Sequence, residues 1–155
     1  MGELRNVIVF TIGAARYAVE LRWVREVVSL GFVTGVPTAP GAVGGVCNLH
    51  GTILPVLDVA ALLDEAGGPP PRQGDGALVI ETEGVVCALR VDQVDHVASL
   101  PELPSVAAPT VLDASGRTLA LLDPAKLVRR AVELVARAGA SMPRSEIAEP
   151  DEASP

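Results

Sequence analysis

The 155-residue sequence has few aromatic side chains, only 3% of its residues, and just two cysteines. Its apolar core must therefore consist of valine, leucine, isoleucine and alanine, and the richness in valine favours β-strands. It also lacks any run of 18 or more apolar residues, and no basic segment followed by an apolar one stands at its start. We therefore expect no membrane insertion, no export signal and a cytoplasmic protein.

Basic residues are scarce as well. The chain has 12 lysines and arginines against 19 acidic residues, a formal net charge of −7. Binding to nucleic acid or to an anionic membrane requires a basic face that displaces counterions, so we exclude both kinds of partner. Because 49% of the residues are hydrophobic and 20% are charged, the chain can bury a substantial core as one domain or two small lobes.

The two cysteines, Cys47 and Cys87, offer little chemistry. In a chain without an export signal we expect both thiols to be reduced and buried. With His50 and His96 they make four possible zinc ligands, but finger or ribbon spacing is missing, so we expect no metal and no other cofactor. Cys47, His50 and Asp58 are the one conceivable nucleophilic triad, yet a strand and turn do not direct this thiolate at the imidazole. No catalytic residue is assigned, and a cysteine-dependent enzyme is the less favoured alternative.

The most informative stretch is VPTAPGAVGGVCNLHGTILPVLD, residues 36–58. Its first two prolines require an extended entry. Two apolar runs then flank Asn48-Leu49-His50-Gly51, a tetrapeptide suited to a turn, and this arrangement predicts a β-hairpin. Asp58 ends the second run, where it can cap a short helix at 59–63.

Other segments have clear signals of their own. Apolar runs and alternation predict further strands at 6–13, 16–21, 77–80 and 85–91. Between 21 and 28 the apolar spacing lengthens to that of one or two helical turns, which predicts a short helix. Residues 64–76 are expected to form an exposed connector. A capping Asp123-Pro124 predicts a C-terminal helix that ends at Gly139, and the acidic tail at 139–155 is expected to be disordered.

The sequence also contains an internal repeat. Residues 17–30 align without a gap on 87–100 at an offset of 70, and residues 51–58 align on 116–123 at an offset of 65. Each copy is too small to bury its own apolar face. We therefore expect two copies of a five-strand unit to pack against each other about a pseudo-twofold axis.

The order of these pieces resembles that of the CheW-like domain family. The shared pieces are Val9 to Gly13, Tyr17 to Val19, Val24 to Val28, Val36-Pro37, Pro40, Gly45-Val46, Asn48 to Gly51 and Ile53 to Asp58. The resemblance implies a mainly β fold of two SH3-like five-stranded β-barrel lobes related by a pseudo-twofold axis, with short helices and a C-terminal helix. It implies a single domain at 1–138, with lobes at about 14–70 and 77–123 plus swapped terminal elements.

The same resemblance implies a non-enzymatic signalling adaptor. Such a protein couples the cytoplasmic domain of a chemoreceptor to the regulatory domain of a CheA-type histidine kinase, in a chemotaxis-like two-component pathway at membrane-associated receptor arrays. The family's partner contacts fall here on Val24, Glu26, Gly45, Asn48, His50 and Gly51.

Two features depart from the family pattern. His50 stands where the family usually has arginine, which replaces a forked cation with an imidazole. Residues 100–116 are shorter than the corresponding family segment. An alternative is therefore a specialised scaffold that has lost one partner or that associates with itself.

Overall fold

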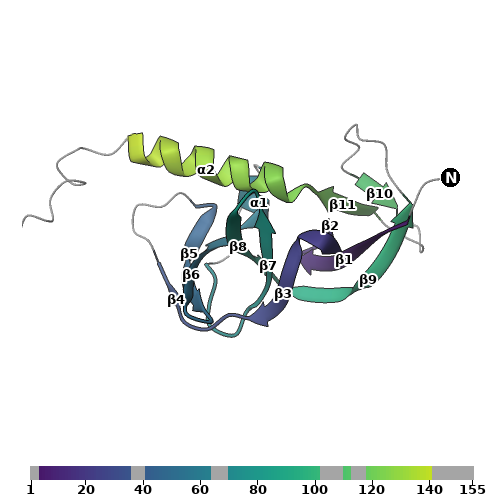
Figure 1. The fold of residues 1–155 in the computed structure, drawn as a ribbon, viewed down its shortest axis with the longest axis horizontal. Coiled ribbons are helices and arrows are strands. Elements are labelled where there is room, and N and C mark those ends of the chain that lie inside the picture. The colour runs from purple at the N-terminus through teal and green to yellow at the C-terminus, as the bar shows by residue number, and fades with distance from the viewer. Residues whose placement is uncertain (1–3, 36–40, 64–69, 102–109, 113–117, 141–155) are drawn as a thin grey trace, which may run out of the picture.

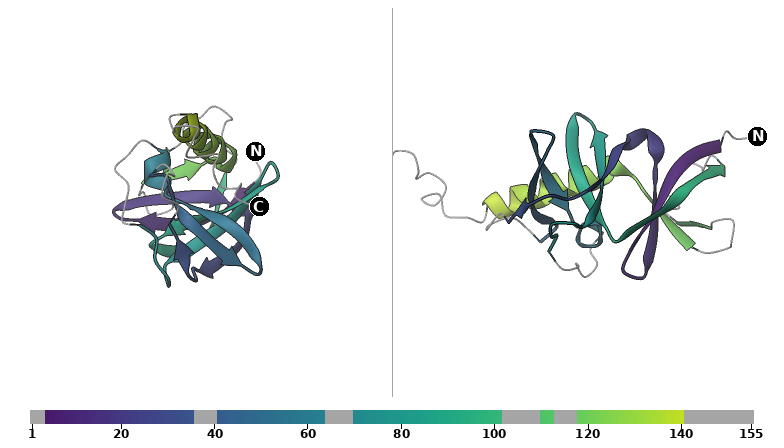
Figure 2. Two further views of the ribbon diagram at one scale, coloured as in Figure 1. Left: turned by 90° about the vertical axis from the view of Figure 1, so that its left-hand side faces the viewer. Right: turned by 90° about the horizontal axis from the view of Figure 1, so that it is seen from below.

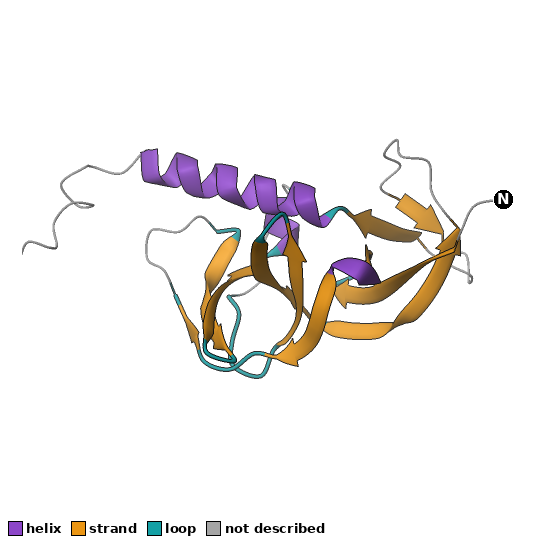
Figure 3. Ribbon diagram, in the orientation of Figure 1, coloured by secondary structure: helices purple, strands orange, loops and turns teal. Residues whose placement is uncertain are grey.

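The computed structural model describes residues 4–35, 41–63, 70–101, 110–112 and 118–140 of the chain. Strands dominate these residues, and helices are few (Figures 1 and 3). The elements are β1 Leu4–Ile12, β2 Ala15–Glu20, the 3-10 helix η1 Leu21–Trp23, β3 Val24–Ser29, β4 Val33–Thr34, β5 Val43–Leu49, β6 Thr52–Leu57, α1 Val59–Leu62, β7 Gly76–Thr82, β8 Val85–Val91, β9 Gln93–Pro101, β10 Thr110–Leu112, β11 Thr118–Leu122 and α2 Pro124–Ala140.

The strands form two sheets side by side, seen from two further directions in Figure 2. Sheet A has the order β10-β11-β2-β1-β9, and sheet B has the order β3-β7-β8-β6-β5-β4. Neighbouring strands are antiparallel except for β11 with β2 and β6 with β8, which are parallel. Both sheets curl as in SH3-like lobes, although the described edge strands of each sheet do not pair with one another.

The predicted repeat is visible in this topology. β2 and β8 occupy equivalent positions at the offset of 70, as do β3 and β9, while β6 and β11 are equivalent at the offset of 65. The copies exchange strands, because β3 pairs with β7 and β9 pairs with β1. Each sheet therefore contains strands from both halves of the sequence.

The helix predicted over 21–28 is wrong. Only Leu21–Trp23 form a single 3-10 turn, and Val24–Ser29 form strand β3. Val24 and Glu26 are thus strand residues. The reason lies in the tertiary structure: burial alternates along β3, and β7 pairs with it in antiparallel register, with Val28 opposite Ala77 and one register shift between Val24 and Glu26. Local apolar spacing cannot reveal that partner, which lies about 50 residues further along the sequence.

Both other predicted helices are confirmed. Asp58 accepts a hydrogen bond from the backbone N–H of Ala61 at 3.2 Å and caps α1. At the start of α2, Asp123 accepts one from the N–H of Ala125 at 3.0 Å. α2 continues one residue beyond Gly139, and its C-terminal end extends past sheet B in Figure 1. No described helix is long and apolar enough to cross a membrane.

The core consists almost entirely of aliphatic side chains, as predicted from the composition. Its largest cluster joins both sheets to α1 and α2, and it includes the stacked rings of Phe10 and Tyr17. A second cluster, which contains Leu54 and Val56, fills the curl of sheet B. A third, around Val9, lies on the other face of sheet A.

Several predictions fall outside the described residues. These are the prolines of 36–40, the first part of the connector at 64–69, most of the shortened segment 100–116 and the acidic tail from 141 onward.

Candidate functional site

The hairpin of β5 and β6 is confirmed, and its turn presents His50 to solvent. Leu49 pairs with Thr52, so His50 and Gly51 form a two-residue loop. Both have positive φ, +52° and +86°, as in the tight turns whose twist matches that of the strands. Asn48 closes the turn by accepting the N–H of Gly51 at 3.0 Å. The local sequence therefore fixes the position of an imidazole side chain that is 72% exposed.

Glu26, on β3, reaches this turn from the other side of sheet B. Its Oε1 lies 3.2 Å from Nε2 of His50, a distance at which a protonated ring nitrogen donates to the carboxylate. β3 is an edge strand, and β5 and β6 lie toward the opposite edge, so the curl of the sheet brings them together. The Glu26 side chain is 39% exposed. The pair thus brings a carboxylate and an imidazole together at the surface.

Two large apolar side chains close to the hairpin turn are exposed. Ile53 is 61% exposed and pairs across the hairpin with Asn48. Phe32 is 75% exposed and precedes Val33, which pairs with Cys47, the neighbour of Asn48. Neither residue is among the contact positions predicted from the sequence. Alternation along β6 could have indicated Ile53, because Leu54 and Val56 face inward, but nothing in the sequence indicated that Phe32 would be exposed.

The structure does not bring every predicted contact residue to this surface. Gly45 is buried with a φ of +154°, and a Cβ there would lie 2.6 Å from the carbonyl oxygen of Thr34. Val24 is half-buried, pairs with Ile80 and packs against the main core cluster. The structure thus gives Gly45 and Val24 evident packing roles, and it brings Glu26, Asn48, His50 and Gly51 together at the surface.

Neither cysteine is arranged for catalysis. Both thiols are buried, and they belong to different core clusters. Burial raises the pKa of Cys47, and it raises the pKa of Cys87 to about 12, so both remain protonated at neutral pH. Among the described residues, no group of three or more histidine, cysteine or acidic side chains is placed to hold a metal ion.

Comparison with protein families gives one match that covers most of the chain. The model of the CheW-like domain matches residues 6–132. Among curated proteins, the probable chemotaxis protein CheW of Rhizobium etli is 31% identical over 98 residues, and the chemotaxis protein CheW of Rhizobium meliloti is 32% identical over 99. Each alignment covers 63% of this chain and 63% of the relative.

A solved structure supports the fold. The scaffolding protein TtCheW from Thermoanaerobacter tengcongensis superposes with a TM-score of 0.64, covering 78% of this chain and 90% of that one. At 21% identity, this likeness establishes the shared architecture alone.

Proposed function

This chain belongs to the CheW-like domain family, and from that premise we propose that it is a non-enzymatic signalling adaptor. The proposed partners are the cytoplasmic domain of a chemoreceptor and the regulatory domain of a CheA-type histidine kinase. The proposed place of action is cytoplasmic, at membrane-associated receptor arrays.

The observation that carries the proposal is the exposed pair of Glu26 and His50. Two segments far apart in the sequence place a carboxylate and an imidazole 3.2 Å apart at the surface, and the same lobe exposes Phe32, before β4, and Ile53, on β6. Polar groups next to exposed apolar side chains are typical of protein contact surfaces. The buried, protonated thiols supply no nucleophile, which favours binding over catalysis.

The proposed mechanism is geometric. An adaptor that holds receptor and kinase at the same time can bias the kinase between active and inactive populations only if its contacts differ between the two states. The proposed contact positions are Val24, Glu26, Gly45, Asn48, His50 and Gly51. Glu26 and His50 supply side-chain contacts, and Asn48 and Gly51 hold the turn. Val24 and Gly45 act through the backbone that they support.

Binding of purified protein to each partner, separately and together, tests the proposal. We expect the receptor fragment and the kinase domain each to bind, and we expect Glu26→Gln to weaken at least one interaction. The control is Arg129→Gln, because Arg129 and Glu83 form another exposed pair, also at 3.2 Å, elsewhere on the surface.

Three outcomes separate the alternatives. Binding to one partner only, with the second restored by His50→Arg, identifies a specialised adaptor with altered partner choice. A concentration-dependent dimer in sedimentation without either partner identifies a self-associating scaffold. Failure to bind either partner overturns the proposed function.

A further inference from the structure

The chain crosses from one sheet to the other at two equivalent places. It leaves sheet A after β2 and enters sheet B at β3 through η1, and it leaves sheet B after β8 and returns to sheet A at β9 through Asp92. These crossovers are related by the offset of 70.

A cluster of alternating charge lies at the first crossover. Nη1 of Arg5 lies 3.2 Å from a carboxylate oxygen of Glu20, and Nε of Arg22 lies 3.2 Å from the other. The Glu20 side chain is 18% exposed between two more exposed arginines, at 41% and 61%. This cluster therefore has the sign order plus, minus, plus.

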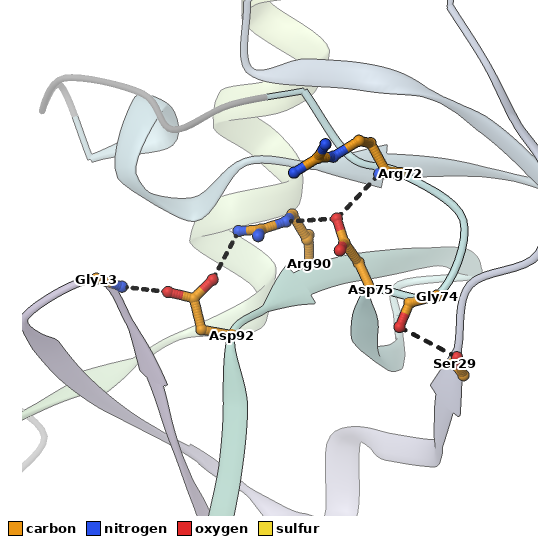
Figure 4. A network of polar contacts seen from close by, with 7 residues as sticks. All are labelled: Gly13, Ser29, Arg72, Gly74, Asp75, Arg90 and Asp92. Carbon is orange, nitrogen blue, oxygen red and sulfur yellow. Dashed lines mark hydrogen bonds and ion pairs between the residues drawn. The ribbon is translucent and has the colours of Figure 1, made fainter.

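A cluster with inverted signs lies at the second crossover. Arg90 lies between two carboxylates, with Nε 3.0 Å from Asp75 and Nη1 3.0 Å from Asp92 (Figure 4). Asp75, Arg90 and Asp92 are the residues 70 positions after Arg5, Glu20 and Arg22. The same three positions of the repeat thus hold an equivalent cluster of opposite charge.

The second cluster is also hydrogen-bonded to the backbone of sheet A and of the segment before β7. Asp92 also accepts the N–H of Gly13, in the β1–β2 turn of sheet A, at 2.6 Å, and its own N–H donates to the carbonyl of Thr11 at 2.9 Å. Asp75 accepts the N–H of Arg72 at 2.9 Å. The outer residues of this cluster, Asp75 and Asp92, are 24% and 39% exposed, less than the outer arginines of the first cluster, although the central residues are equally shielded. Charged hydrogen bonds of this kind lose less strength to solvent when they are shielded.

We propose that the Arg90 cluster is a fixed pivot that sets the angle between sheets A and B, and that the Glu20 cluster, whose outer arginines are more exposed, contributes less to that angle. In the adaptor function proposed above, on which this consequence rests, Arg90 is a positioning residue. It determines where the Glu26–His50 surface of sheet B lies relative to any contact made by sheet A.

Distance measurement between spin labels tests the pivot on the isolated protein. Val27→Cys on β3 and Val97→Cys on β9 are equivalent positions on different sheets, 50% and 54% exposed. The buried native thiols, protonated at neutral pH, stay unlabelled. We expect one narrow distance in the parent protein, a broad or shifted distribution in Arg90→Gln, and no broadening in Glu20→Gln. An unchanged distribution in Arg90→Gln, or equal broadening in both variants, overturns the proposal.

A charge-inversion variant provides a second test in case Arg90→Gln perturbs folding. Arg90→Glu alone places three acidic groups together, whereas Asp75→Arg, Arg90→Glu and Asp92→Arg together reproduce the polarity of the first cluster. We expect the triple variant to have a narrower distribution than Arg90→Glu, since the ion pairs return while the Gly13 hydrogen bond does not. A triple variant as broad as Arg90→Glu would contradict a pivot held by charge. No partner is present in these measurements, so failure of the adaptor function would leave their result intact.

Discussion

Nε2 of His50 lies 3.2 Å from Oε1 of Glu26, although the two residues are 24 positions apart and come from strands toward opposite edges of one sheet. The sequence predicts each residue separately as a contact position. The curl of sheet B brings the two side chains into contact. Both side chains stay accessible from solvent while they touch, with exposures of 72% for His50 and 39% for Glu26.

The first prediction separates binding from stability at this pair. Glu26→Gln and His50→Gln each remove an exposed charged or imidazole contact, so the free energy of unfolding should change by less than about 1 kcal/mol. Partner affinity should fall about tenfold or more, equivalent to about 1.4 kcal/mol. Urea unfolding and calorimetric binding measure the two quantities. A large loss of stability in either variant would show that the pair is structural instead.

The second prediction concerns three glycines in different surroundings. Gly51→Ala should lower the free energy of unfolding by roughly 1–2 kcal/mol. The reason is the φ of +86° alone, because an added Cβ would meet no atom within 4 Å. Gly45→Ala should cost about 3 kcal/mol or more, since it adds a clash with Thr34 to an unfavourable φ. The matched control is Gly41→Ala, because no atom lies within 4 Å of a Cβ added at Gly41. This variant should change the free energy of unfolding by less than about 1 kcal/mol. Urea unfolding of the three variants ranks them; equal costs at positions 41 and 45 would refute the packing role.

A third prediction concerns acid stability. Burial alone would raise the pKa of Asp75, but hydrogen bonds from the N–H of Arg72 and the Arg90 guanidinium outweigh it and hold that pKa below its ordinary value. This stabilisation is present above the ordinary pKa of about 3.9 and is lost as pH falls through the lower folded-state value. As the pH falls below about 4, the Asp75→Asn variant should therefore lose less stability than the parent protein does. Thermal unfolding across that range measures the difference, and parallel curves would contradict it.

The fourth prediction concerns the thiols. The pKa of Cys87 is about 12 in the fold and about 8.5 in an unfolded chain, so the group's contribution to stability is present below the unfolded value and is lost as pH rises above it. At neutral pH a thiol-specific reagent should modify Cys47 and Cys87 only as fast as the protein unfolds. The rate in denaturant provides the reference. Fast modification of Cys47 in the native protein would revive the cysteine-dependent alternative.

Much of the local structure could be predicted from the sequence. The tetrapeptide at 48–51 predicts its hairpin because the turn suits asparagine and glycine, and Asp58 and Asp123 predict the two helix starts because their carboxylates cap free N–H groups. Aliphatic composition predicts the core. The offset of 70 predicts equivalent strands, and it also aligns the two charge clusters residue by residue.

Only the tertiary structure decided how these pieces combine. Val24–Ser29 became a strand instead of a helix because β7, from the other half of the chain, supplied its hydrogen-bond partners. The contact between Glu26 and His50, the exposure of Phe32 and the linking of Gly13 to Asp92 depend in the same way on strands that are distant in sequence. Local propensity acts over a few residues, so it fixes turns and caps; pairing over tens of residues requires the whole sheet, and that pairing places the candidate site.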